Sequence, residues 1–275
     1  TATNLNGSFA DNHVNEEVAE KLSIKLTNNM GIVPYDEDGT MLYVVTKPSK
    51  PEKGIFLSMQ GGAEGCLYNS RGPVQDEEAL IANAGPSDGH TSIMIMSTDD
   101  WTKYGLKVIH PNCPDVSFDS SDSIYTSAIN KILIKENPNN LPVFVSGMSR
   151  GSIRAANIAS RLGQKIRGTI ILSGSTDHTH DGTMSDPPIK EANSSFLMIM
   201  HKNDKCSSSK SLDGLKSFSE ELTGVNDKKI VQVEGGFASM SSGRDAWCDT
   251  HSHHGFWGMH NEVLKIIKSW ILKRI

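Results

Sequence analysis

A serine flanked by glycines lies where two kinds of sequence pattern meet. Residues 143–146 form a short apolar run, and residues 150–162 carry apolar side chains at helical spacing. Between them, Ser149 has Gly147 two places before it and Gly151 two places after it. A sharp strand-to-helix turn strains the residue at its apex, and side chains on its neighbours would clash there. G-x-S-x-G at this junction predicts a serine presented for nucleophilic attack; the alternative is a glycine-rich turn with a solvated serine.

A serine hydroxyl is a weak nucleophile and needs a base, together with an acid that orients the base. Asp204 lies in HKNDKC directly after the apolar run 196–200, which places it in a loop at the end of a predicted strand. His201 comes shortly before Asp204, and we expect it to pack or bond beneath the acid's loop.

The base is expected from a histidine-rich segment that leads into the last predicted helix. His251, His253, His254 and His260 all lie there, and each is a residue type suited to general base catalysis. Serine, acid and histidine then follow one another along the chain in the order expected when each comes from a loop after a parallel strand.

Attack on a carbonyl also needs two N–H donors directed at the oxygen that becomes negatively charged. The residue after the nucleophile, here Arg150, supplies one of them. We expect the second from SMQGGAEG, residues 58–65, where glycines allow the backbone to approach a substrate closely. Gly62 is the preferred donor and Gly61 the alternative, although the two glycines could simply end a strand.

These residues need a sheet edge to bring them together, and the rest of the chain predicts one. Short continuous apolar runs are typical of strands buried on both faces of a parallel sheet. They cover residues 54–60, 92–97, 143–146, 168–174, 196–200 and 229–234. Residues 123–135, 150–162 and 261–275 have helical spacing instead. The alternation predicts an α/β fold with a mostly parallel, twisted sheet and helices on both faces.

The first part of the chain has a different pattern. Residues 42–57 predict two strands joined by a turn rich in proline and lysine, and hence an N-terminal antiparallel hairpin. We find no internal repeat or long linker, so we expect a single domain over residues 1–275, with residues 1–30 as a candidate N-terminal extension. The segment 176–195 is short and polar, which predicts a minimal lid.

Length, charge and hydropathy exclude several classes of protein. The chain has 275 residues and a formal net charge of −5, which argues against nucleic acid as a partner. No stretch reaches the roughly 18 apolar residues that a membrane-spanning helix needs. The first residue is Thr rather than Met, which fits either a removed leader or a trimmed chain. Nothing in the sequence indicates an oligomeric state.

Four cysteines, Cys66, Cys113, Cys206 and Cys248, are spread widely along the chain. An even number favours two disulfides in an exported protein, whereas in a cytosolic protein such thiols are more often simply buried. They form no C-x-x-C pair, and their wide spacing is unfavourable for a metal site. We therefore expect a secreted or periplasmic protein.

With these residues in view, the chain resembles the α/β-hydrolase superfamily from about residue 40 to its C-terminus. DKC, followed by C…HHGFWG and a final VLKIIKSWI helix, resembles the small exported members in particular. The resemblance implies that Ser149 is the nucleophile and Asp204 the acid. Asp177, after the run 168–174, is the alternative acid, because some relatives carry the acid one strand earlier. The resemblance also implies that His254 is the base, because His254 stands in an H-G-F triplet, with His253 as the next candidate.

The same resemblance bears on the cysteines and on the glycine loop. It implies a disulfide between Cys206 and Cys248 that ties the acid loop to the histidine loop, and it leaves Cys66 and Cys113 as a second pair. Gln60 stands where many esterases of this superfamily have a histidine, so the second oxyanion donor stays open between the two glycines.

The implied activity is that of a serine hydrolase, which cleaves carboxylic esters through an acyl-enzyme with a Ser-His-Asp triad. Neither a metal nor an organic cofactor is required for this chemistry. The substrate is expected to be a small-molecule or polymer-linked ester in an open cleft. Residues 61–91 and 99–118 would shape the cleft, with Trp101, Tyr104 and Trp257 either as aromatic walls or as packing residues.

Three alternatives stay open. A serine peptidase or amidase would use the same triad and fold. A zinc-dependent hydrolase would use DHTHD, 177–181, and HSHH, 251–254, although the first cluster falls one position short of an H-x-H-x-D-H spacing. The third alternative is a binding module without catalysis, and an intact set of serine, aspartate and histidine argues against it.

Overall fold

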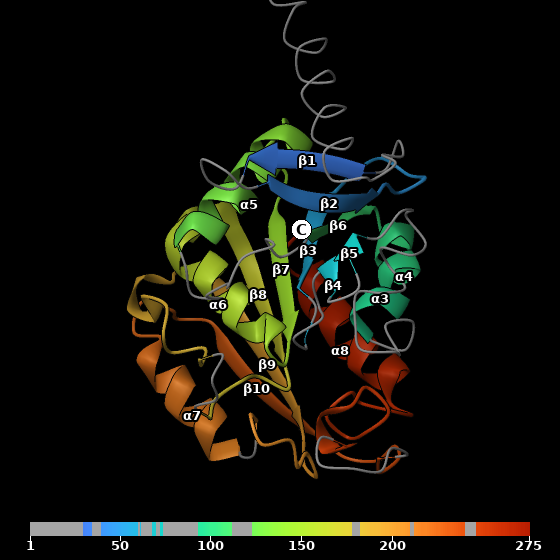
Figure 1. Cartoon of the computed structure of the whole chain (residues 1–275), viewed down its shortest axis with the longest axis vertical. Coiled ribbons are helices and arrows are strands. Elements are labelled where there is room, and N and C mark those ends of the chain that lie inside the picture. The colour runs from blue at the N-terminus through green and yellow to red at the C-terminus, as the bar shows by residue number, and fades with distance from the viewer. Residues whose placement is uncertain are drawn as a thin grey trace, which may run out of the picture.

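One large sheet brings distant segments of the chain together. The computed structural model describes residues 30–34, 40–59, 61, 68–69, 72–73, 93–111, 123–177, 182–209, 212–239 and 246–275 (Figure 1). Within these residues, eight strands form a sheet in the order β1-β2-β6-β3-β7-β8-β9-β10. Their bounds are β1 Met30–Pro34, β2 Thr40–Thr46, β3 Gly54–Met59, β6 Leu106–Pro111, β7 Val143–Met148, β8 Ile166–Leu172, β9 Ser195–His201 and β10 Lys228–Val233. A separate antiparallel pair consists of β4 Tyr68–Asn69 and β5 Gly72–Pro73.

The sheet is mostly parallel, as the apolar runs predict. Strand β6 pairs in parallel with β3, and parallel pairing continues through β7, β8, β9 and β10. Parallel strands end at the same edge of a sheet, so the carboxyl ends of β7, β8 and β9 lie next to one another. Ser149, Ser173 and the loop after His201 all follow these three ends directly.

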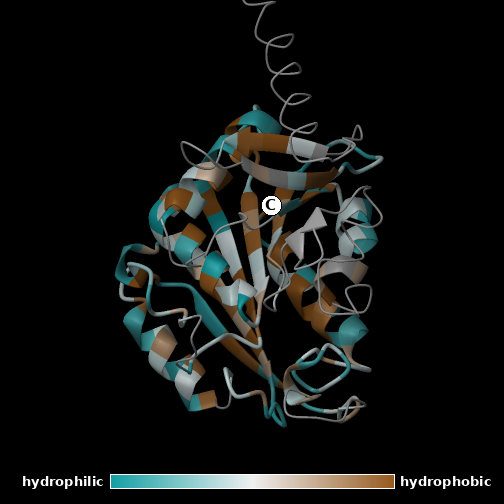
Figure 2. Cartoon of the chain, in the orientation of Figure 1, coloured by the Kyte–Doolittle hydropathy of each residue, from teal (hydrophilic) through white to brown (hydrophobic). Residues whose placement is uncertain are grey.

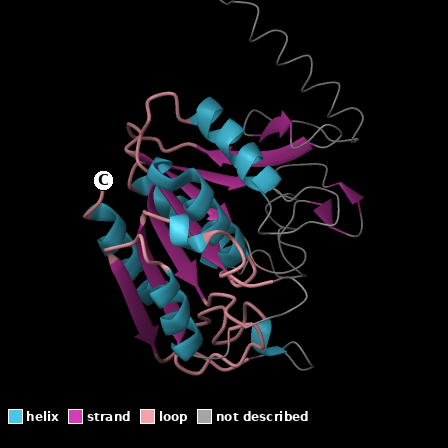
Figure 3. Cartoon of the chain, turned by 90° about the vertical axis from the view of Figure 1, so that its left-hand side faces the viewer, coloured by secondary structure: helices cyan, strands magenta, loops and turns pink. Residues whose placement is uncertain are grey.

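Helices cover both faces of the sheet. The helices within the described residues are α3 Ile93–Met96, α4 Thr98–Lys103, α5 Ser123–Glu136, α6 Gly151–Leu162, α7 Leu212–Glu221 and α8 His260–Leu272, with short 3-10 turns η2 Gly163–Lys165, η3 Ile189–Glu191 and η4 Ala246–Cys248. Buried residues of α5, α6 and α7 join one core cluster, and those of α3, α4 and α8 join a second. Hydrophobic residues are concentrated on the central strands between them (Figure 2), and the side view shows helices in front of the sheet (Figure 3).

One predicted strand is wrong. Within residues 92–97 the structure has helix α3, and the strand in this region is β6. A short apolar run suits a strand and a buried helix equally well, so periodicity cannot separate them. The same analysis misses β6 because Lys107 and His110 interrupt its apolar residues. The segment 99–118, expected to form a pocket loop, instead contains α4 and β6.

The predicted hairpin over residues 42–57 is also wrong in its pairing. The antiparallel pair at the start of the sheet is β1 with β2, and β2 pairs next with β6 rather than with β3. Strand β3 therefore lies between two parallel neighbours, β6 and β7, and every one of its side chains is buried. Residues 47–53 connect β2 to β3 across β6, and the Lys53 N–H donates at 2.8 Å to the carbonyl of Gly105, directly before β6 begins. Local turn chemistry cannot reveal such a crossing.

Of the aromatic residues considered as cleft walls, Trp101 packs in the interior and the partly buried Tyr104 packs against the same core cluster. Trp101 is 2% exposed and stacks on Phe56, with 4.8 Å between ring centroids. The Tyr104 hydroxyl accepts a hydrogen bond from Lys268 of α8. Both side chains therefore belong to the layer of α4 and α8.

A buried cation in β6 joins this strand to two other segments. Lys107 is 6% exposed, and its Nζ donates to the backbone oxygen of Glu136 at 2.6 Å. The same Nζ lies 3.1 Å from a carboxylate oxygen of Glu52 and 3.9 Å from one of Glu136. A buried ammonium is tolerated when carboxylates and hydrogen bonds replace its hydration in this way.

We expect Lys107→Ala to lower the free energy of unfolding by about 2–3 kcal/mol, because it leaves the Glu136 carboxylate without its cation. Chemical denaturation measures this change. The matched control is Lys103→Ala, whose pair with Asp100 spans 3.8 Å between side chains that are 70% and 45% exposed. That variant should change the free energy of unfolding by less than about 1 kcal/mol. Equal effects of the two substitutions would contradict the role given to Lys107.

Candidate active site

Ser149 occupies the turn between β7 and α6. Its φ of 52° lies in the left-handed region, which residues other than glycine seldom adopt. A Cβ on Gly147 would lie 2.2 Å from the carbonyl oxygen of Gly151 and 2.8 Å from the Cβ of Ala155, so this position must be glycine. The Ser149 N–H donates to the Leu172 carbonyl at 2.9 Å, which fixes the turn to the end of β8. The serine is thereby held at the carboxyl edge of the sheet, where α6 begins.

The glycine loop after β3 lies against this turn. A Cβ on Gly61 would lie 2.8 Å from the Met148 carbonyl oxygen and 3.0 Å from the Cβ of Ser149. Only a residue without a side chain allows the two backbone segments to approach so closely. Arg150 follows Ser149 at the N-cap position of α6. Gly62 and Gln60 lie outside the described residues, so the preference for Gly62 over Gly61 stays a prediction.

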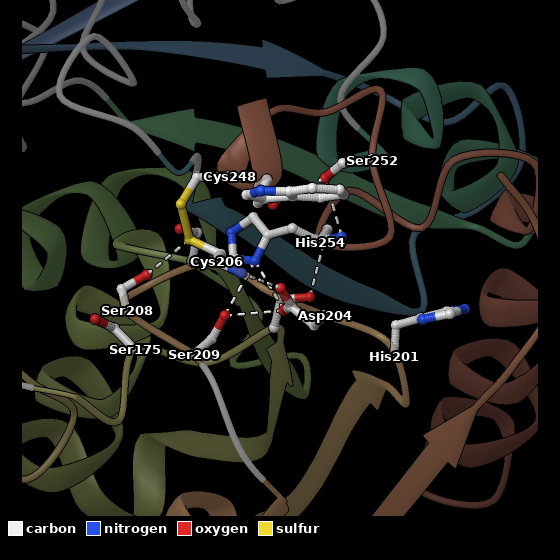
Figure 4. Close-up of polar contacts among 12 residues, drawn as sticks. Ser175, His201, Asp204, Cys206, Ser208, Ser209, Cys248, Ser252 and His254 are labelled. Carbon is white, nitrogen blue, oxygen red and sulfur yellow. Dashed lines mark hydrogen bonds and ion pairs between the residues drawn. A yellow bond between two sulfur atoms is a disulfide. The ribbon is translucent and has the colours of Figure 1, made fainter. Parts of the chain in front are cut away.

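Asp204 and His254 form a buried pair after β9 and before α8 (Figure 4). The two side chains are fully buried, and 2.9 Å separates the imidazole Nδ1 from the carboxylate Oδ2. A carboxylate only accepts hydrogen bonds, so Nδ1 carries the proton and donates it. The Cys206 N–H donates to Oδ1 at 2.9 Å, and the Ser209 hydroxyl donates to Oδ2 at 2.9 Å. Three donors from three positions therefore hold one carboxylate.

These donors decide the ionisation of Asp204. Burial, the largest single effect, raises the pKa of its carboxyl group. The charge and hydrogen bond of His254, together with the bonds from Cys206 and Ser209, act in the opposite direction. Their combined effect is greater, so the pKa of Asp204 lies below its ordinary value of 3.8. The carboxylate is consequently ionised at neutral pH despite its burial.

The second ring nitrogen of His254 is an acceptor in this tautomer. Nε2 is buried and has no hydrogen-bond partner among the residues that the structure describes. Two neighbouring residues link this histidine to the serine turn, because Leu172 accepts the Ser149 N–H and the Ser173 hydroxyl donates to the His254 carbonyl at 2.7 Å. The end of β8 therefore contacts both the serine turn and the histidine loop.

Close backbone packing builds the loop that carries His254. The Ser252 hydroxyl donates to the Asp249 carbonyl at 2.7 Å and accepts the His254 N–H at 3.1 Å. A Cβ on Gly255 would lie only 2.1 Å from the Thr250 carbonyl oxygen, which excludes any other residue there. These contacts explain the glycine of the H-G-F triplet.

The other histidines of this segment have other contacts. His251 Nδ1 lies 3.2 Å from Asp249 Oδ1, and the ring also meets Trp257 edge-on at 4.4 Å between centroids. His260 Nε2 donates to a backbone carbonyl of the histidine loop at 3.0 Å. The alternative acid, Asp177, accepts from its neighbour Thr176 at 3.2 Å. Of the candidate acids and bases, Asp204 and His254 are the two that form a buried imidazole–carboxylate pair.

His201 connects the acid loop with the histidine loop. Its Nδ1 accepts the Asn203 N–H at 3.0 Å, and its Nε2 donates to the Gly235 carbonyl at 2.9 Å. The ring stacks face to face on His253, with centroids 4.2 Å apart and an interplanar angle of 3°. Burial, as the largest effect, lowers the pKa of His201, in keeping with a neutral ring that uses one nitrogen as acceptor. These contacts fit the packing role expected from the sequence.

A disulfide ties the same two loops together. Cys206, in the acid loop, is bonded to Cys248, in η4, across a sequence separation of 42. Figure 4 shows this bond beside the His254 ring. The bridge that the resemblance implies is therefore present. The other predicted pair, Cys66 and Cys113, lies outside the described residues.

Sequence reasoning missed Ser209. Its hydroxyl contacts both members of the buried pair, at 2.9 Å from Asp204 Oδ2 and 3.1 Å from His254 Nδ1. Ser209 belongs to a run of consecutive serines, KCSSSK, in which nothing distinguishes one hydroxyl from the next. The conformation of the turn after Asp204 directs the Ser209 side chain inward, and this conformation cannot be read from the sequence.

The sequence also bears on a metal site and on a membrane span. Within the part of the chain that the structure describes, no group of three or more His, Cys, Asp or Glu side chains could hold a metal ion. His178, His180 and Asp181 of the candidate zinc cluster lie outside the described residues. None of the described helices is both long enough and apolar enough to span a bilayer.

We expect Asp204→Asn to lower the free energy of unfolding by about 1–3 kcal/mol at pH 7. The pKa of the Asp204 carboxyl lies below its unfolded value of 3.8 in the folded protein. The stability that ionised Asp204 contributes is therefore present above the unfolded pKa and is lost as the pH falls through the folded pKa. The gap between wild type and variant should therefore narrow below about pH 4. Urea denaturation at pH 7, 5 and 3.5 measures it; a gap independent of pH would show that the pair does not depend on ionised Asp204.

Replacing both Cys206 and Cys248 by alanine should lower the free energy of unfolding by about 2–4 kcal/mol, because the bridge restricts a long loop in the unfolded chain. The double variant leaves the other two cysteines untouched, which treatment with a reductant would not. Denaturation curves of the two proteins, recorded without reductant, give the difference. Coincident curves would mean that the bridge adds nothing to stability.

No family model matches the sequence, and no curated protein matches it either. Several solved structures align over most of the chain. Est1E from Butyrivibrio proteoclasticus aligns with a TM-score of 0.56 and 10% identity, over 90% of this chain and 99% of that one. A thermostable carboxyl esterase from Bacillus coagulans has a TM-score of 0.56, 14% identity and coverage of 90% and 99%.

The apo form of esterase 2 from Thermogutta terrifontis aligns with a TM-score of 0.58 and 11% identity, over 90% of this chain and 96% of that one. At identities this low, the likeness concerns the path of the backbone rather than the activity. The antiparallel β1–β2 pair, the parallel sheet from β6 to β10 and the helices on both faces agree with these structures. The chain has the α/β-hydrolase fold.

Proposed function

We propose that this protein is a serine hydrolase that cleaves carboxylic esters through an acyl-enzyme. Ser149 is the nucleophile, His254 the base and Asp204 the acid that orients the base. The observation that carries the proposal is the buried Asp204–His254 pair, which leaves the Nε2 of His254 without a partner among the described residues, at the sheet edge where Ser149 lies.

In the first half of the reaction, His254 Nε2 takes the proton of Ser149 as the serine oxygen attacks the acyl carbon. Asp204 stays ionised and stabilises the imidazolium that forms. The alcohol then leaves with the proton from His254. In the second half, water attacks the acyl-enzyme with His254 again as the base, which releases the acid and restores the serine.

A hydrogen bond between the Ser149 hydroxyl and His254 is not formed in this structure, because Nε2 has no partner among the described residues. Such bonds are often long in free enzymes and shorten when substrate binds. The turn fixes the backbone of Ser149, so rotation about the Cα–Cβ bond is the motion that the proposal requires. This rotation leaves the Asp204–His254 pair undisturbed.

Two backbone N–H groups would stabilise the negatively charged oxygen of the tetrahedral intermediate. Arg150 is one proposed donor, because it follows the nucleophile at the start of α6. The close approach of Gly61 to Ser149 supports the glycine loop as the source of the other, with Gly62 preferred and Gly61 as the alternative. The intermediate would then lie between the glycine loop after β3 and the start of α6.

The proposed substrate is a small-molecule or polymer-linked ester in an open cleft. Between β8 and β9, the described residues form only the short turn η3, which supports a minimal lid rather than the apolar lid of an interfacial lipase. The three similar structures described above are esterases by name or title, which favours esters over peptides as substrates. The Cys206–Cys248 bridge supports a secreted or periplasmic location, because disulfides persist in oxidising compartments.

A fluorophosphonate probe tests the mechanism, because it reacts with an activated serine. The probe should label Ser149, and Ser149→Ala should abolish labelling and reduce hydrolysis of short p-nitrophenyl esters by at least about 10³-fold. The matched control is Ser185→Ala, because that hydroxyl bonds to Glu221 on the surface, and this variant should keep full labelling and activity.

Other results would favour the alternatives. Full activity in Ser149→Ala would refute the serine mechanism. Loss of activity with a chelator and its return with zinc would support a metal-dependent hydrolase. Hydrolysis of peptide substrates in preference to every ester would make the protein a peptidase on the same triad. Labelling without turnover of any substrate would favour a binding module.

A further inference from the structure

Ser209 contacts both members of the buried pair. It is 3% exposed and closes the turn that begins at Asp204, with its N–H donating to the Cys206 carbonyl at 3.1 Å. The Cys206 N–H in turn donates to Asp204 Oδ1, and the Cys206 sulfur is bonded to Cys248. The backbone of this turn is therefore fixed at several points, and the Ser209 hydroxyl points toward the Asp204–His254 pair (Figure 4).

The single hydroxyl proton of Ser209 has one acceptor in this arrangement. It goes to Asp204 Oδ2 at 2.9 Å, since the facing Nδ1 of His254 carries its own proton. The Ser209 oxygen still has a lone pair, and it lies 3.1 Å from that Nδ1. The Nδ1–H thus points at two acceptors, the carboxylate and the serine oxygen, which resembles a shared hydrogen bond.

The neighbouring serine shows that this contact is specific. The Ser208 hydroxyl lies 3.2 Å from the sulfur of Cys206, on the side of the disulfide. Figure 4 shows the two serines directed differently, Ser208 toward Cys206 and Ser209 toward the pair. Consecutive residues of the same type therefore offer a matched comparison.

We propose that Ser209 is a positioning residue for the base: it holds the Asp204 carboxylate in place, and its oxygen accepts the Nδ1–H of His254 when the carboxylate is absent. The proposal rests on the proposed function of the site, because it concerns the orientation and tautomer of the proposed base. Without either acceptor, the imidazole is free to turn or to move its proton to Nε2, where the proton would block abstraction from Ser149.

The first experiment compares kinetics of ester hydrolysis. Ser209→Ala should lower kcat by about 10-fold or more with little change in KM, because it removes a hydrogen bond to a charged group that does not touch substrate. Ser208→Ala should leave both constants unchanged. Threonine and valine have the same shape, but only threonine carries a hydroxyl. Ser209→Thr and Ser209→Val can therefore be compared instead if Ser209→Ala does not fold. Thr should restore kcat relative to Val.

The second experiment tests the reserve acceptor. Asp204→Ala alone should retain a residual kcat. Adding Ser209→Ala to this variant should lower the residual kcat by about a further 10-fold. Ser208→Ala in the same Asp204→Ala background should not. If Ser209→Ala has the same kcat as the wild type, or Ser209→Val the same kcat as Ser209→Thr, the proposal that Ser209 holds the carboxylate is overturned. If Asp204→Ala and the double variant Asp204→Ala/Ser209→Ala have equal kcat, the role of Ser209 as an acceptor is overturned.

A third measurement does not depend on turnover. The Nδ1–H proton of His254 can be followed by NMR in protein labelled with ¹⁵N-histidine, and Ser209→Ala should shift its resonance and speed its exchange with water. If this change occurs in a protein that hydrolyses no ester, the role of Ser209 holds and the proposed function fails. If wild type hydrolyses esters but Ser209→Ala changes neither kcat nor the resonance, the proposed function holds and this inference fails.

Discussion

The buried hydrogen bond between Asp204 and His254 is the interaction on which the arrangement of the site depends. An ionised carboxylate removed from water is unfavourable unless a partner and hydrogen bonds replace its hydration. Here the donors are one imidazole, one hydroxyl and one backbone N–H. Each donor must hold its place, so the turn after Asp204, the histidine loop and the disulfide are constrained together. The pair is therefore a structural feature as well as a chemical one.

The serine has a separate support. Ser149 is held by the packing of α6 against β7 and by its bond to Leu172, whereas His254 is held by its own loop and by Ser173. The end of β8 is the element shared by both. This division fits the proposed reaction, in which the base and its acid would keep their hydrogen bonds while the Ser149 hydroxyl turned towards the base.

The sheet determines which loops can meet. The carboxyl ends of parallel strands lie at one edge of the sheet. The order β7-β8-β9 therefore places the serine turn, Ser173 and the acid loop side by side along this edge. Helix α8 follows the histidine loop and packs against the face that also holds α3 and α4. At Gly147 and Gly61, neighbouring atoms leave no room for a Cβ, so the serine turn packs directly against α6 and against the glycine loop. Side chains at either glycine would separate the elements that the site joins.

The amino-acid sequence by itself determined the parts of this protein that depend on local pattern. Continuous apolar runs indicated most of the parallel strands, the G-x-S-x-G junction indicated the strained turn at Ser149, and chain order indicated Asp204 as the acid. The choice of His254 and the Cys206–Cys248 bridge came from resemblance rather than from local physics. Tertiary structure decided the rest, because α3 and β6 differ in packing and not in periodicity, and β2 meets β6 only through a crossing. Ser209 became recognisable among its neighbouring serines only in three dimensions, since burial and direction distinguish hydroxyls that the sequence cannot.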